Sequence, residues 1–108
     1  MADSVANPSD AEVNREIQRF SMQALELAKS VVDGSATDEE KQTARALSER
    51  LPELAAKAGA LADDYRVGAA RTLADARLDL AYVAADGAVP SSTRLGWYIK
   101  EKGADQGR

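Results

Sequence analysis

The sequence predicts an all-α protein, and three observations support this prediction. Two stretches place apolar residues three and four positions apart, which aligns them along one face of a helix. Residues that end or begin helices separate these stretches, and no stretch alternates apolar and polar residues as a half-buried strand would. The first stretch contains Val13, Ile17, Phe20, Ala24, Leu27 and Val31, and the second contains Ala44, Leu47, Leu51, Leu54, Ala58, Leu61 and Tyr65.

This pattern predicts an up-and-down antiparallel bundle of three or four helices, followed by a short C-terminal helical segment. A length of 108 residues fits one domain. We expect residues 1–8 to form a flexible tail, residues 9–87 to form the bundle, and residues 88–108 to form a linker, a short helix and a tail. Much of the hydrophobic content is alanine, which buries little area, so the predicted core is thin.

The first two helices have clear boundary residues. Ser9 or Asp10 is a suitable N-cap for the first, which we expect to run to about Val32 and to end at Gly34. A capping box over Thr37–Glu40 begins the second. Pro52 removes one backbone hydrogen bond, so we expect a kink there or a break near Arg50–Pro52. The apolar spacing continues through Pro52, which favours a kink over a true loop.

The third helix follows a shift of one residue in the apolar spacing, which predicts a turn or bend between about Ala62 and Gly68, with Asp63 or Asp64 as the N-cap. Asp86-Gly87 ends this helix, and residues 93–102 form the short last one. The apolar residues of the third helix are Tyr65, Ala69, Thr72, Leu73, Ala76, Leu80 and Val83.

The composition argues against most kinds of catalysis. The chain has no cysteine and no histidine, so the common zinc sites, nucleophile–base pairs and di-iron sites cannot be built. Carboxylates remain at Asp38–Glu40 and Asp63–Asp64, where an acid/base pair or a Mg²⁺ site is the alternative to helix capping. Adjacent residues of a helix point about 100° apart, which suits chelation poorly. We therefore expect no enzyme, no cofactor and no metal.

Charge and hydropathy bear on partners and location. The net charge is −4; residues 1–64 contribute −6 and residues 65–108 contribute +2. An acidic body argues against nonspecific binding of nucleic acid. No apolar run approaches the ~20 residues of a membrane helix, and no secretion signal is present. We expect a soluble cytoplasmic protein that does not bind membranes, and the frequent Ala, Asp and Arg are typical of bacteria or their phages.

Surplus apolar residues point to a protein partner. Met22 and Leu25 widen the apolar face of the first helix, and Leu78 and Tyr82 widen that of the third, which suggests more than one neighbour for each. The segment Leu95, Trp97, Tyr98 and Ile99 is a second candidate, because aromatic residues anchor interfaces. For Trp97, folding back onto a core poor in aromatics is the favoured alternative. We expect a helical interaction module of regulatory or assembly type that forms homo-oligomers.

The alternative is a small DNA-binding transcriptional regulator. Residues 83–103 loosely resemble the helix, glycine turn and Ser/Thr-capped second helix of helix-turn-helix proteins, although Gly96 weakens the second helix. In this interpretation four residues lie near phosphates or bases: Ser92, Arg94, Lys100 and Lys102.

Overall fold

The computed structural model describes the backbone of residues 2–106 and the side chains of residues 10–103. Over this range the chain forms five α-helices and no strand, which confirms the all-α prediction. The helices are α1 (Ala2–Asp33), α2 (Asp38–Glu49), α3 (Leu51–Gly59), α4 (Asp63–Ala84) and α5 (Thr93–Gln106). The molecule is elongated, with extents of 58 × 27 × 18 Å.

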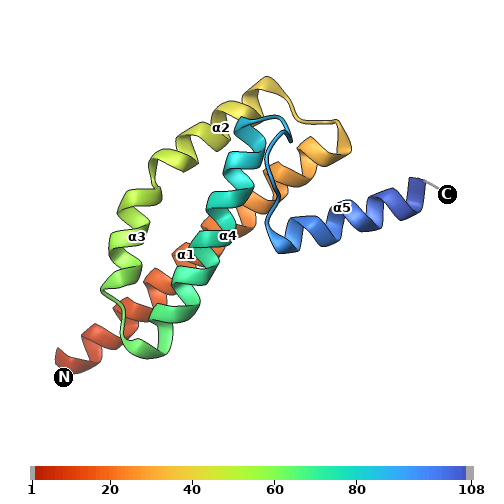
Figure 1. The fold of residues 1–108 in the computed structure, drawn as a ribbon. Coiled ribbons are helices and arrows are strands. Elements are labelled where there is room, and N and C mark those ends of the chain that lie inside the picture. The colour runs from red at the N-terminus through yellow and green to blue at the C-terminus, as the bar shows by residue number, and fades with distance from the viewer. Residues whose placement is uncertain (1, 107–108) are drawn as a thin grey trace.

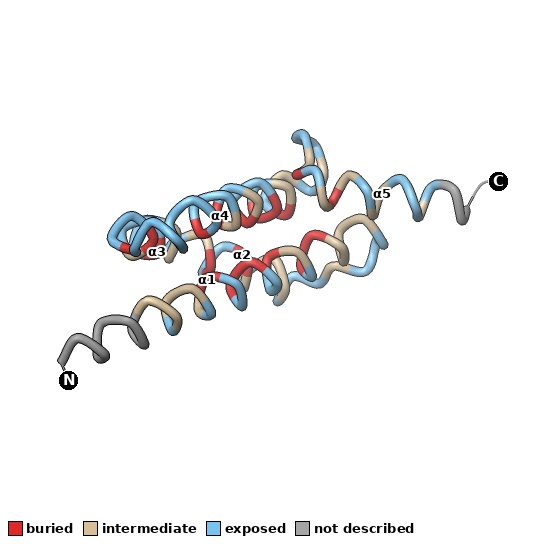
Figure 2. The backbone as a smooth tube through the Cα atoms, turned by 90° about the horizontal axis from the view of Figure 1, so that it is seen from below, coloured by how far each residue is buried: buried red, intermediate tan, exposed pale blue. Residues whose placement is uncertain are grey.

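The helices run back and forth along the long axis of the molecule. In Figure 1, α1 rises from the N-terminus, α2 and α3 return in succession, and α4 rises again beside α1. The fifth helix contacts α1 and α4 but neither α2 nor α3 within the described residues. It extends from the side of the molecule, and its last turns reach away from the other helices (Figures 1 and 2).

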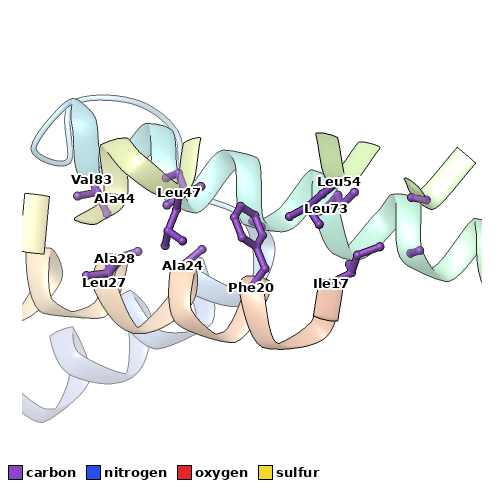
Figure 3. Close-up of a cluster of buried hydrophobic side chains, with 14 of the residues drawn as sticks. Ile17, Phe20, Ala24, Leu27, Ala28, Ala44, Leu47, Leu54, Leu73 and Val83 are labelled. Atoms are coloured by element: carbon purple, nitrogen blue, oxygen red, sulfur yellow. The ribbon is translucent and has the colours of Figure 1, made fainter. Parts of the chain in front are cut away.

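The core lies where α1 faces α4, α2 and α3. Figure 3 shows Ile17, Phe20 and Ala24 of α1 pointing toward Leu47, Leu54 and Leu73 on the facing helices. Figure 2 shows that the buried positions follow the facing sides of the helices. Both apolar stretches identified in the sequence are buried or partly buried along their full length. The 3–4 spacing therefore identified the core-facing sides of α1, α2 and α3 correctly.

Two predicted helix boundaries are confirmed in atomic detail. At the end of α1, Gly34 has φ +76°, and the amides of Gly34 and Ser35 donate to the carbonyls of Val31 and Ser30 at 3.1 and 2.9 Å. This is the Schellman arrangement. At the start of α2, the Glu40 amide donates to Thr37 Oγ1 and the Thr37 amide donates to Glu40 Oε1, which completes the capping box.

Of the two outcomes expected at Pro52, the structure has the break between two helices and not the favoured kink. Glu49 ends α2, Leu51 begins α3, and Arg50 alone separates them. Pro52 has no amide hydrogen to continue the helical bonding, and its ring favours the first turn of a new helix. Arg50 also donates to Glu16 of α1 at 2.6 Å, which fixes the chain at the break.

Other boundaries differ from the sequence prediction. Helix α1 begins at Ala2, so residues 2–8 of the predicted tail and the predicted N-cap at Ser9 or Asp10 fall within a helix. Pro8 costs this helix one backbone hydrogen bond but does not end it. The turn before α4 lies at residues 60–62, earlier than expected, and Ala62 is the N-cap. Asp63 and Asp64 therefore occupy the first turn of α4, where negative charges interact favourably with the helix dipole.

The C-terminal helix is longer than predicted. It begins at Thr93 as expected but continues to Gln106, so Gly103–Gln106 do not form the expected tail in this structure. Residues 107 and 108 lie outside the described residues. Helix α4 ends before Asp86-Gly87 as predicted, but Asp86 takes the left-handed conformation at φ 53° together with Gly87 at φ 83°.

Candidate interaction surface

A buried charged cluster attaches α5 to the rest of the molecule. Asp79 of α4 is fully buried and accepts from Ser92 Oγ at 2.6 Å. Its other carboxylate oxygen accepts from Arg94 Nε and Nη2 at 2.9 and 2.6 Å. Arg94 also donates to the backbone carbonyl of Ser21 in α1 at 3.0 Å. One guanidinium thus joins α1, α4 and α5 through charge-assisted hydrogen bonds, two of which meet at the same carboxylate oxygen.

Ser92 of this cluster also caps the N-terminus of α5. Ser92 precedes Thr93, the first residue of the helix, and its hydroxyl accepts from the Leu95 amide at 3.2 Å. A serine in this position is an N-cap. Leu95 follows one turn inside the helix and is completely buried. The hydrogen bonds of Ser92 and the buried side chain of Leu95 therefore hold the start of α5 in one orientation.

A second attachment lies further along α5. The Tyr98 hydroxyl donates to the carboxylate of Asp33, the last residue of α1, at 2.8 Å, and Lys102 pairs with the same carboxylate at 3.6 Å. This hydrogen bond to Asp33 raises the pKa of the Tyr98 phenol, because it stabilises the protonated form. The ammonium group of Lys29 lies 5.0 Å from the centre of the Tyr98 ring.

Trp97 projects from this fixed helix into solvent. It is 63% exposed, although folding back onto the core was the favoured expectation. Leu95 occupies the buried position instead, because residues two apart on a helix point to opposite sides. Lys100 lies over the indole at 5.4 Å, and a shallow hollow beside it is lined by Thr93, Gly96, Trp97 and Lys100.

The remaining residues predicted to bind a partner fall into two groups. Met22 is 57% exposed and Leu78 is 44% exposed, so both are available at the surface. Leu25, Tyr82 and Ile99 are half-buried and pack against the core. Of the additional apolar residues predicted on α1 and α4, Leu25 and Tyr82 therefore pack against the core, whereas Met22 and Leu78 stay exposed.

The residues predicted for DNA binding are mostly engaged within the protein. Ser92 is buried and Arg94 is bound to Asp79, so neither faces outward as the helix-turn-helix interpretation requires. Lys102 pairs with Asp33. Lys100 is exposed. The four side chains therefore do not form one basic surface, because the carboxylates of Asp79 and Asp33 attract two of the cations.

Sequence reasoning missed two features that shape this surface. Asp79 is one, and its only signal was an acidic residue beside Leu80 on the buried face of the predicted third helix. The other is a groove between α2–α3 and α4, lined by Pro52, Ala55 and Gly59 on one side and by Ala70 and Ala74 on the other. Arg66 and Arg77 of α4 also line it.

Comparison with protein-family models, curated proteins and solved structures finds no match to this chain. None of the helices within the described residues combines the length and the hydropathy needed to cross a membrane.

Proposed function

We propose that this protein is a non-enzymatic helical interaction module of regulatory or assembly type that self-associates through apolar side chains left outside its core. The observation that supports the proposal is the exposure of several large apolar side chains on well-anchored helices. Trp97 is 63% exposed, Val67 65%, Met22 57% and Leu78 44%. Burying such residues against a partner is favourable, and Trp is among the residues that contribute most at interfaces.

The anchoring of α5 strengthens this proposal. Trp97 lies between the Asp79–Arg94 attachment and the Tyr98–Asp33 attachment, so it is held outward by contacts on both sides. A side chain that is fixed before binding loses less conformational entropy on binding. We also propose that α1, the α2–α3 pair and α4 form an up-and-down bundle in solution, with α5 as an appendage that presents Trp97.

The test is the molecular mass of the full chain in solution, measured by light scattering over a wide range of concentration. We expect the mean mass to rise above that of a monomer as concentration rises. The four exposed apolar residues are then replaced by alanine one at a time, and at least one replacement should weaken association about tenfold or more. A mass of one chain at every concentration would contradict self-association.

The DNA-binding alternative has less support, because Arg94 and Ser92 are bound within the protein. A gel-shift titration of the same full chain with duplex DNA at low salt tests it. Binding that Lys100→Ala and Lys102→Ala weaken would favour the alternative, since each phosphate contact contributes to a salt-dependent affinity.

A further inference from the structure

Helix α4 has an apolar stripe on its outer side as well as on its buried side. Its inner residues pack against α1, α2 and α3. On the opposite side Val67 and Leu78 are 65% and 44% exposed, and the alanines between and beyond them are exposed too. We call this set the outer stripe: Val67, Ala70, Ala74, Leu78 and Ala81. Most surface helices are apolar on one face only, so a second apolar face indicates a second neighbour.

The outer stripe spans two successive eleven-residue segments that are identical at four positions, and we call this pair of segments the repeat. Residues 64–74 read DYRVGAARTLA, and residues 75–85 read DARLDLAYVAA. The repeat aligns Asp64 with Asp75, Arg66 with Arg77, and Val67 with Leu78. Eleven residues are close to three turns of an α-helix, so equivalent residues lie above one another along the helix.

The charged residues of the repeat lie on opposite sides of the outer stripe. With about 100° between successive residues, Asp64 and Asp75 fall on one side of Val67 and Leu78. Arg66 and Arg77 fall on the other side, where they line the groove next to α3. Arg66 is also paired with Asp63 of its own helix at 2.6 Å. The outer stripe therefore has one edge that is acidic on balance and one that is basic on balance.

We infer that a second copy of this chain packs its own α4 against the outer stripe, parallel to the first and related to it by a two-fold axis along the helices. In a parallel pair, each edge of one helix faces the opposite edge of the other. Asp64 and Asp75 then lie near Arg66 and Arg77 of the partner subunit, respectively, and the symmetry repeats both pairs. This inference rests on the proposed self-association and names the face that carries it.

The antiparallel arrangement is unfavourable for the same edges. A two-fold axis perpendicular to the helices would place the acidic edges together and the basic edges together, and like charges repel. The alanines of the outer stripe favour close approach of the two helices, because the distance between helix axes depends on the side chains at the contact. Arg71 lies on the acidic edge as well, so Asp64, Arg71 and Asp75 together leave this edge with a net charge of −1.

Two double variants of the full chain test the inference by light scattering or sedimentation. Asp64→Lys with Asp75→Lys makes both edges basic, and Arg66→Glu with Arg77→Glu makes both edges acidic. Each variant alone should dimerise at least about tenfold more weakly than the original chain, because four attractive pairs become repulsive. An equimolar mixture of the two should form a heterodimer, since every contact then joins opposite charges.

Matched controls place the same changes of charge outside α4. Glu49→Lys with Glu101→Lys, and Arg15→Glu with Arg45→Glu, alter exposed residues of α1, α2 and α5 and should leave the dimer intact. Circular dichroism shows whether each variant keeps its helical content.

The possible results separate this inference from the proposed function. A dimer that the two α4 variants do not weaken overturns the inference while self-association stands, and weakening by Trp97→Ala alone would place the interface on α5. Failure of the folded variants to form a heterodimer on mixing would also overturn it. A chain that stays monomeric throughout contradicts both proposals.

Discussion

Two of the charged clusters that join helices in this protein differ in their access to water. Asp79 is fully buried, and it binds Ser92 and Arg94. Glu16 of α1 is 30% exposed and accepts from Arg50 Nη2 at 2.6 Å and from Lys57 Nζ at 3.3 Å. Arg50 also lies over the Phe20 ring at 5.8 Å. The first cluster holds α5, and the second holds the junction of α2 and α3.

The difference in exposure determines what each cluster contributes. When one partner of a half-exposed pair is removed, water solvates the other, so such pairs contribute little to stability. A buried carboxylate has no such substitute, and the loss of one partner leaves an uncompensated charge or polar group. The buried cluster therefore ties the position of α5 to the stability of the whole fold, whereas the half-exposed cluster can be altered locally.

The largest expected effect is that of Asp79→Ala. It leaves the Arg94 guanidinium without its carboxylate in a largely buried place, and we expect a loss of about 3–5 kcal/mol in the free energy of unfolding. Urea denaturation followed by circular dichroism measures this loss. The control is Glu101→Ala on α5, where an exposed carboxylate outside the proposed dimer interface should change stability by no more than about 0.5 kcal/mol. Equal effects of the two variants would contradict the structural role of Asp79.

The next effect compares two apolar residues of α5. Leu95→Ala should cost about 2–5 kcal/mol, because it opens a cavity under the helix. Trp97→Ala should change the unfolding free energy of the monomer by no more than about 0.5 kcal/mol, although it removes a larger side chain, because Trp97 is 63% exposed. Urea denaturation at low protein concentration separates the two. A large loss for Trp97→Ala would mean that the indole packs on the core.

A smaller effect is expected at the half-exposed cluster. Glu16→Gln keeps the shape of the side chain but removes the charge that Arg50 and Lys57 share, and we expect a loss of about 0.2–1 kcal/mol at neutral pH. Urea denaturation of Glu16→Gln and Asp79→Ala under the same conditions compares the two losses of unfolding free energy. If Glu16→Gln cost as much as Asp79→Ala, exposure would not explain the difference between the clusters.

The pH dependence of stability sharpens the comparison further. Burial opposes ionisation of Glu16, but hydrogen bonds from Lys57 and Arg50 outweigh it and lower its pKa below the ordinary value of 4.5. The unfolded chain therefore binds a proton at Glu16 more readily than the folded one, and stability falls as pH falls. The contribution of Glu16 to the free energy of unfolding is complete at pH values well above 4.5. It disappears as the pH falls through the lowered pKa of Glu16 in the folded protein. We therefore expect the difference in the free energy of unfolding between the original chain and Glu16→Gln to become smaller as the pH falls from 4.5 through the lowered pKa. Urea denaturation at several pH values measures this change.

Part of the candidate site could be predicted from the sequence. Met22, Leu78 and Trp97 were predicted to bind a partner, and all three are exposed. Leu95 was identified with them but lies in the core, because helical spacing alone does not say which side of α5 faces α1 and α4. Asp79 was missed, since its role depends on Ser92 and Arg94 folding back across a turn.

The sequence by itself determined the all-α class and some of the helix ends, namely the ends of α1 and α4 and the starts of α2 and α5. The apolar spacing of α1 and α2–α3, Gly34 and the Thr37–Glu40 capping box are local features, and interactions within a few residues suffice to specify them. The tertiary structure decided where α5 lies, which of its apolar residues is buried and which side of α4 stays open. These outcomes depend on contacts between residues far apart in the chain, such as Arg94 with Ser21 and Tyr98 with Asp33, which no local pattern encodes.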